Sequence, residues 1–131
     1  MLADESPVEA KITSILGKRF ISIDYQGSLE GKFFEGKMII GFDIPYQKFK
    51  TSWVDSFHMG TQIMLSSGEA TAHGFSVFGE YGSTEYGEQL CWRTTLETIN
   101  ENEIILTAYN VSPVGKEVKA TETVYRRKQF I

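Results

Sequence analysis

Two carboxylates occupy positions where an alternating, strand-like segment would turn a side chain inward. Asp55 follows Trp53 by two residues, so both side chains share one face of their segment. Glu122 shares its face with three apolar residues that we expect to point inward: Val118, Ala120 and Val124. A buried carboxylate is costly unless it is paired or protonated. Three side chains elsewhere in the chain could supply such a partner: Arg93, Tyr109 and Tyr125.

These groups allow two interpretations. They could form a polar patch that orients a ligand, or an acid–base pair with shifted pKa values. They could equally form a structural ion pair near the rim of a barrel, and this plainer interpretation is favoured.

Aromatic residues supply the apolar part of a candidate site. The chain has 9 Phe, 6 Tyr and 2 Trp, and both tryptophans are predicted to lie in mid-strand on inward faces. Large aromatics can fill a barrel as core, or can line a cavity for one small ligand. The candidate ligand-binding residues are Trp53, Asp55, Trp92, Arg93, Tyr109, Glu122 and Tyr125.

This sequence contains no recognisable catalytic or metal-binding motif. It contains no G-x-S-x-G and no H-E-x-x-H motif, and its two histidines, His58 and His73, are far apart in the chain. We therefore expect no catalytic residues, no bound metal and no cofactor. The single cysteine, Cys91, cannot form an internal disulfide, which is typical of a reducing compartment.

The charge and hydropathy of the chain exclude several classes of partner. A net charge of −4 argues against nucleic acids and anionic membranes, since both attract a positive field. The short basic run Arg126-Arg127-Lys128 is interpreted as a solvated strand end. No apolar stretch approaches the roughly 20 residues of a membrane span, and residues 1–7 are acidic where a secretory signal would be basic and then apolar. We expect a soluble, cytoplasmic protein.

The candidate site residues lie in segments that alternate apolar and polar residues, as strands do, and turn residues separate these segments. Turn signals include Ser67-Gly68-Glu69 and Gly82-Ser83, and between the signals we predict about nine strands: 8–15, 19–29, 36–42, 48–56, 60–67, 72–79, 88–98, 104–111 and 117–127. Sequential hairpins favour an all-β, antiparallel up-and-down meander. We expect a single domain over 1–131, with 1–7 irregular. Residues 6–17 also fit a helix, because Ser6 and Pro7 suit a helix start and Gly17 a helix end.

Several short motifs in order resemble those of an uncharacterised bacterial family, domain of unknown function 1579. The run Leu16-Gly17-Lys18-Arg19-Phe20 is similar to the family's first hairpin, with Lys18 in place of its second glycine. The next three motifs are Phe34-Glu35-Gly36, Gly41-Phe42-Asp43 and Trp53-Val54-Asp55. The last are Arg93-Thr94 and a closing hairpin from Pro113-Val114-Gly115-Lys116-Glu117 to Glu122, Tyr125, Arg127 and Lys128.

This resemblance covers about residues 8 to 128 and implies a lipocalin-like (calycin) β-barrel. It also implies that residues 8–15 form a strand and not a helix. Family members usually begin with a helix and a further strand before that one, so either the remaining strands close the barrel among themselves or strand 8–15 keeps an unpaired edge. Such an edge is a template for pairing with another chain, and we expect a homodimer.

The resemblance brings no established activity, so three functions remain open. The first is a non-enzymatic binder of a small apolar or amphipathic molecule inside the barrel. The second is an enzyme of undefined chemistry that uses a carboxylate or tyrosine at the barrel mouth. The third is a protein-interaction module that uses a strand edge or the barrel surface.

Overall fold

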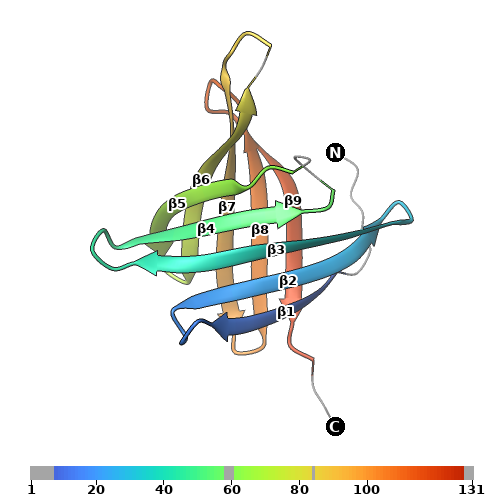
Figure 1. The fold of residues 1–131 in the computed structure, drawn as a ribbon, viewed down its shortest axis with the longest axis vertical. Helices are drawn as coiled ribbons and strands as arrows, with labels where there is room; N and C mark the ends of the chain where they lie inside the picture. The colour runs from blue at the N-terminus through green and yellow to red at the C-terminus, as the bar shows by residue number, and fades with distance from the viewer. Residues whose placement is uncertain (1–7, 58–60, 84, 129–131) are drawn as a thin grey trace.

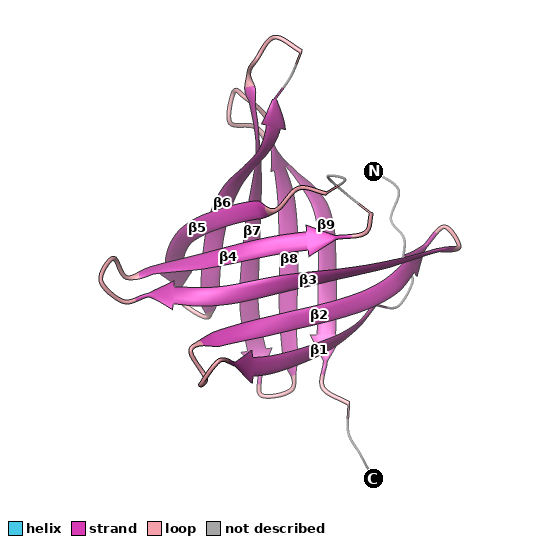
Figure 2. Cartoon of the chain, in the orientation of Figure 1, coloured by secondary structure: helices cyan, strands magenta, loops and turns pink. Residues whose placement is uncertain are grey.

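The described residues form nine β-strands and no helix. The computed structural model describes residues 8–57, 61–83 and 85–128. Its strands are β1 (Val8–Ile15), β2 (Phe20–Leu29), β3 (Lys32–Asp43), β4 (Lys48–Asp55), β5 (Met64–Thr71), β6 (Gly74–Ser83), β7 (Gln89–Asn100), β8 (Glu103–Val111) and β9 (Glu117–Arg126). Figure 2 shows this all-strand content directly. The predicted all-β fold is confirmed, and the helix considered for residues 6–17 is wrong over Val8–Ile15.

The strands make an antiparallel up-and-down meander. Each pairs with its neighbours in sequence, in the order β1-β2-β3-β4-β5-β6-β7-β8-β9. In Figure 1, β1–β4 cross in front of β7–β9 at a steep angle, so the single sheet curls until its two ends approach each other. β1 and β9 lie side by side without a hydrogen-bonded ladder in the described residues. An ion pair of 3.5 Å joins Lys128 Nζ to Glu9 Oε1 across this seam. The barrel is therefore nearly closed.

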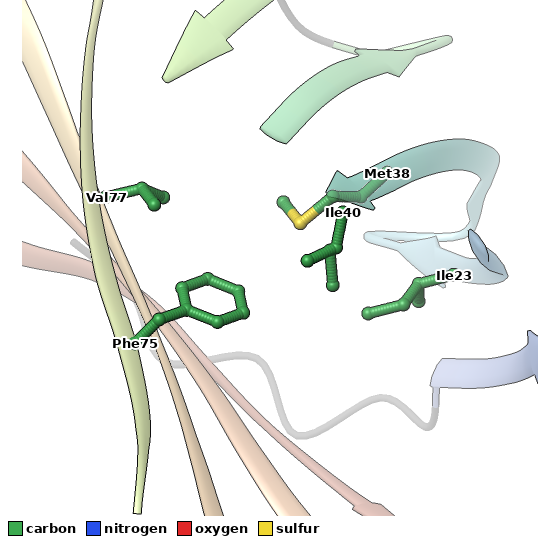
Figure 3. Close-up of a cluster of buried hydrophobic side chains, with 5 residues drawn as sticks. All are labelled: Ile23, Met38, Ile40, Phe75 and Val77. Carbon is green, nitrogen blue, oxygen red and sulfur yellow. The ribbon is translucent and has the colours of Figure 1, made fainter. Parts of the chain in front are cut away.

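The barrel core lies where the two layers face each other. Side chains of Ile23, Met38 and Ile40 point from β2 and β3 toward Phe75 and Val77 of β6 (Figure 3). These residues occupy alternating strand positions, so intervening residues such as Asp24 and Lys37 lie on the other face of the sheet, where they form an ion pair of 3.2 Å. Burial of apolar area at about 25 cal/mol per Å² is the main force that holds the curled sheet together.

Two glycines allow the backbones of β5, β6 and β7 to approach one another closely. A Cβ atom on Gly68 would lie 1.8 Å from the Ser76 carbonyl oxygen, and one on Gly74 would lie 1.7 Å from the Leu96 carbonyl oxygen. The turn predicted at residues 67–69 is wrong, because Gly68 lies inside β5. Gly68 allows the backbones of β5 and β6 to approach closely, which is another reason for a glycine within a strand. No helix in the described part of the chain has the length and apolarity to cross a membrane.

The close approach at Gly74 gives a prediction about stability. Gly74→Ala should lower the free energy of unfolding by about 1–3 kcal/mol, because the new methyl group must displace backbone of β7. Gly82→Ala is the matched control, since a Cβ there meets nothing within 4 Å. Denaturant midpoints measure both changes, and equal midpoints for the two variants would contradict the close packing at Gly74.

Candidate functional site

A hollow of about 1390 Å³ opens beside the seam between β1 and β9. Inward side chains from five strands line its inner wall: Ala10, Tyr25, Asp55, Ile104 and Tyr125. The opposite end of the barrel is closed by rings, because Phe49 stacks on Phe75 at 5.0 Å and meets Phe42 edge-on at 4.9 Å. The barrel interior is thus filled at one end and open, with polar groups, at the other.

Tyr25 occupies the centre of the polar end. Its ring lies over Gly36 of β3, where a Cβ atom would come within 2.3 Å of the ring. Its phenol oxygen accepts a hydrogen bond from the indole Nε1–H of Trp53. Gly36 therefore provides room for the ring, and Trp53 fixes the position of its hydroxyl.

The two tryptophans meet inside the barrel from strands that are not neighbours. The ring centroids of Trp53 on β4 and Trp92 on β7 lie 6.0 Å apart, with the planes 12° from parallel. Tyr81 contacts Trp92 edge-on at 5.9 Å, and its hydroxyl donates to Asn110 Oδ1 at 2.8 Å. Both indoles thus face inward, as their alternating segments predict. Each stays partly exposed, so the cost of about 3–5 kcal/mol for truncating a buried Trp is an upper bound here.

Asp55 brings a carboxylate to the same end. It pairs with Gly36 across the β3–β4 ladder, and Trp53 precedes it by two residues on the same face. Its Oδ1 accepts the backbone N–H of Phe57 at 3.2 Å. The predicted shared face of Trp53 and Asp55 is therefore present in the structure.

The two phenols of the hollow are held in their protonated form. Burial raises the pKa of Tyr25 far above its ordinary value, and the negative charges of Asp55 and ionised Tyr125 add to the rise, while the Trp53 hydrogen bond opposes it. Burial alone raises the pKa of Tyr125 to about 12. Both side chains are hydrogen-bonding hydroxyls at neutral pH and not phenolates.

Arg93 and Tyr109 lie on the outer wall, away from the hollow. The Arg93 guanidinium donates to both carboxylate oxygens of Glu117, at 2.6 and 2.8 Å, and sits 4.2 Å from the centre of the Tyr109 ring. Hydrogen bonding from Arg93 lowers the pKa of Glu117. Arg93 does pair with a carboxylate, but neither of the two considered from the sequence.

Glu122 also faces outward, so the inward face expected for it is wrong. It pairs with Thr107 on the outer face of β8 and makes an ion pair of 3.3 Å with Lys119. The reason is an irregularity in the β8–β9 ladder, where Ala120 is left without an opposite residue. One extra residue reverses the alternation beyond it, which turns Thr121, Thr123 and Tyr125 inward in place of Glu122 and Val124.

Of the seven candidates, the structure thus places Asp55 and Tyr125 on the wall of the hollow and stacks Trp53 on Trp92 inside the barrel. Sequence reasoning missed Tyr25 as a member of this group. The sequence did contain a signal for it, because Tyr25 shares one strand face with Ile21 and Ile23. His58 lies outside the described residues, and His73 lies in the exposed turn between β5 and β6. No group of three His, Cys, Asp or Glu side chains in the described part could hold a metal ion.

The raised pKa of Tyr125 predicts a change in alkaline stability. An unfolded tyrosine loses its proton near its ordinary pKa of 10.0, whereas folded Tyr125 keeps it until about 12. The unfolded state then binds fewer protons, so stability falls as pH rises between these two values. Tyr125→Phe should make this fall shallower, measured by urea unfolding from pH 8 to 12. Below about pH 9 the difference in free energy of unfolding between the wild type and Tyr125→Phe should be constant. If the two plots of this free energy against pH stay parallel up to pH 12, the phenol of Tyr125 is not buried.

Comparison with known proteins places the chain in a family without giving it an activity. A search of curated proteins finds no match. A sequence model of one family matches residues 1–127, nearly the whole chain. The resemblance noted from the motifs is thereby confirmed, and the chain belongs to the family described as "Protein of unknown function (DUF1579)".

Proposed function

We propose that this protein is a non-enzymatic binder of a small apolar or amphipathic molecule, which it holds in the hollow beside the β1–β9 seam. The observation that carries the proposal is the division of the barrel interior into a packed apolar end and an open end with Tyr25, Asp55 and Tyr125 on its wall. Small-molecule sites typically combine apolar surface with a few polar groups, and the inner wall offers Ala10 and Ile104 beside the polar groups of Tyr25, Asp55 and Tyr125.

The size of the hollow suits one small ligand. Its volume of about 1390 Å³ exceeds the roughly 300–1,000 Å³ of common ligand sites, and its lining includes charged residues of β1 and of the end of the chain, such as Glu9 and Lys128. A ligand could place its apolar body against Ala10 and Ile104 and its polar group near Tyr25 and Tyr125.

The protonation of the tyrosines supports binding over acid–base catalysis. A general base needs a pKa near the working pH, whereas burial raises the pKa values of Tyr25 and Tyr125 away from neutrality. Their hydroxyls are suited to donate hydrogen bonds to a bound molecule. These pKa values argue against an enzyme that uses either tyrosine as its general base.

Filling the hollow should abolish binding of an apolar probe. Ile104 faces the hollow opposite Tyr125, and Ile104→Trp places an indole in the ligand volume. We expect Nile red, an uncharged dye, to bind the wild-type chain and to bind Ile104→Trp about tenfold more weakly, a loss of about 1.4 kcal/mol. Dye fluorescence during titration gives both dissociation constants.

Ile105→Trp is the matched control for that experiment. Ile105 is the next residue of β8 and pairs with Glu97 and Val124 on the outer face, so the same substitution leaves the hollow empty. Its dye affinity should equal that of the wild type. Equal affinities for all three proteins would place the dye elsewhere and would count against the proposal.

The open edges of β1 and β9 support a second proposal, that the chain forms a homodimer through β1. β1 pairs with β2 along its whole length, and its other edge has no ladder partner in the described residues. Backbone groups on such an edge can pair with a second copy.

Sedimentation equilibrium at micromolar concentration tests the dimer, and a single species of 14.8 kDa would rule it out. If a dimer forms, Thr13→Pro removes a backbone N–H from the middle of β1 and should weaken it. A dimer that survives this substitution unchanged must use another surface of the barrel.

A further inference from the structure

Two phenol hydroxyls face the same hollow from opposite sides of the seam. Tyr25 lies on β2, where it pairs with Ala10 of β1, and Tyr125 lies on β9, where it pairs with Ile104 of β8. All four residues line the hollow. The charge of an ionised Tyr125 acts on the phenol of Tyr25, so the two groups lie close together. The wall of the hollow therefore carries a pair of hydroxyls beside two apolar side chains.

The hydroxyl of Tyr25 is held in a position where it can donate to a further partner. A tyrosine hydroxyl can donate one hydrogen bond and can also accept. The indole N–H of Trp53 already donates to the Tyr25 oxygen, and no acceptor among the described residues takes the Tyr25 proton. A hydroxyl that accepts a hydrogen bond becomes a better donor, because linked hydrogen bonds polarise one another. Trp53 therefore prepares Tyr25 to donate.

The hydroxyl of Tyr125 makes no hydrogen bond to any group in the described part of the chain. Burial raises the pKa of Tyr125 to about 12 and also raises the pKa of Tyr25, so both groups carry their protons at neutral pH. A ligand that enters the hollow displaces water from these hydroxyls. A donor that loses water and gains no acceptor costs free energy, so the ligand must supply an acceptor.

The basic side chains of the hollow belong to its rim. Lys11, Lys37 and Arg126 lie at outward strand positions, and Arg127 and Lys128 follow the end of β9. Among the described residues that line the hollow from inward positions, none is basic. An anionic head group at the inner wall would lose water without gaining a cation, which is costly. An uncharged acceptor avoids that cost.

We infer that the hollow selects an uncharged molecule with a carbonyl group, whose oxygen accepts hydrogen bonds from Tyr25 and Tyr125. A carbonyl oxygen has two lone pairs and can accept from both hydroxyls at once. A hydrocarbon of the same shape would cover both donors without replacing the water that they lose. This inference rests on the proposed function, because it names the class of molecule that the binding site takes.

Three naphthalene derivatives of similar shape test this inference. 2-Acetylnaphthalene carries a ketone, 2-isopropenylnaphthalene replaces the ketone oxygen by a CH2 group, and 2-naphthoate carries a carboxylate. Calorimetry gives the three dissociation constants, and the decisive quantity is the ratio of ketone affinity to alkene affinity. The ketone loses the same water in every variant of the protein, so a change in this ratio between variants reports the hydrogen bonds alone. We expect 2-naphthoate to bind the wild-type chain more weakly than the ketone.

Tyrosine-to-phenylalanine variants assign the effect to the two hydroxyls. Tyr125→Phe should lower the ratio of ketone to alkene affinity about threefold, and Tyr25→Phe combined with Tyr125→Phe should lower it about tenfold. Tyr109→Phe is the matched control, because Tyr109 packs under Arg93 on the outer wall, and it should leave the ratio unchanged.

Infrared spectroscopy gives an independent readout of the same hydrogen bonds. The carbonyl stretching band of 2-acetylnaphthalene bound to the wild-type chain should lie at lower wavenumber than the band of the ketone in cyclohexane, and Tyr125→Phe should move it back toward that value. If the double variant does not fold because Trp53 has lost its acceptor on Tyr25, Tyr125→Phe and the infrared band still decide the question.

The outcomes separate the two proposals. If Nile red binds in the hollow but the ratio of ketone to alkene affinity is the same in the wild type and in Tyr125→Phe, the carbonyl inference is wrong while the proposed function stands. If 2-naphthoate binds best, the rim cations Lys11 and Arg127 dominate and the inference is also wrong. If neither the dye nor any of the three naphthalenes binds, both proposals fail.

Discussion

The contact between the two layers of the curled sheet is the interaction on which the rest of the structure depends. Ile23, Met38 and Ile40 can be buried only if β2 and β3 lie across from Phe75 and Val77 of β6. In that arrangement the backbones of neighbouring strands approach Gly68 and Gly74 too closely for any side chain at these two positions. Once this contact exists, alternation along each strand decides which side chains enter the interior, except where an irregularity such as that at Ala120 reverses it.

The same contact divides the interior into two unlike ends. The apolar cluster and the stacked rings of Phe49 and Phe75 fill one end, so the remaining inward residues are left around an open space. A charged side chain such as Asp55 lies at the open end, whereas the packed end would impose the full cost of desolvation. The packing of the apolar cluster at one end therefore accounts both for the open hollow and for the position of Asp55 beside it.

Alternation and turn spacing predict the strands from sequence, but they cannot locate irregularities. All nine strands were predicted, and the inward placement of Trp53, Asp55 and Trp92 follows from simple period-two alternation. Glu122 was placed on the wrong face because the extra residue at Ala120 reverses the alternation, and nothing in Val118–Val124 marks that position. Gly68 was taken as a turn because a strand glycine that serves close packing looks the same in sequence.

The seam between β1 and β9 links the two proposals. A closed ladder between these strands would remove the exposed edge and, at the same time, the opening of the hollow. Glu9 and Lys11 lie on β1 and also line the hollow's rim. A second copy paired along β1 would therefore border the entrance, and the ligand and the partner chain would share one part of the surface. Ligand binding in the hollow and pairing of two chains along β1 are then coupled. If the partner chain narrows the entrance and changes the affinity for the ligand, the ligand must change the affinity between the two chains by the same factor.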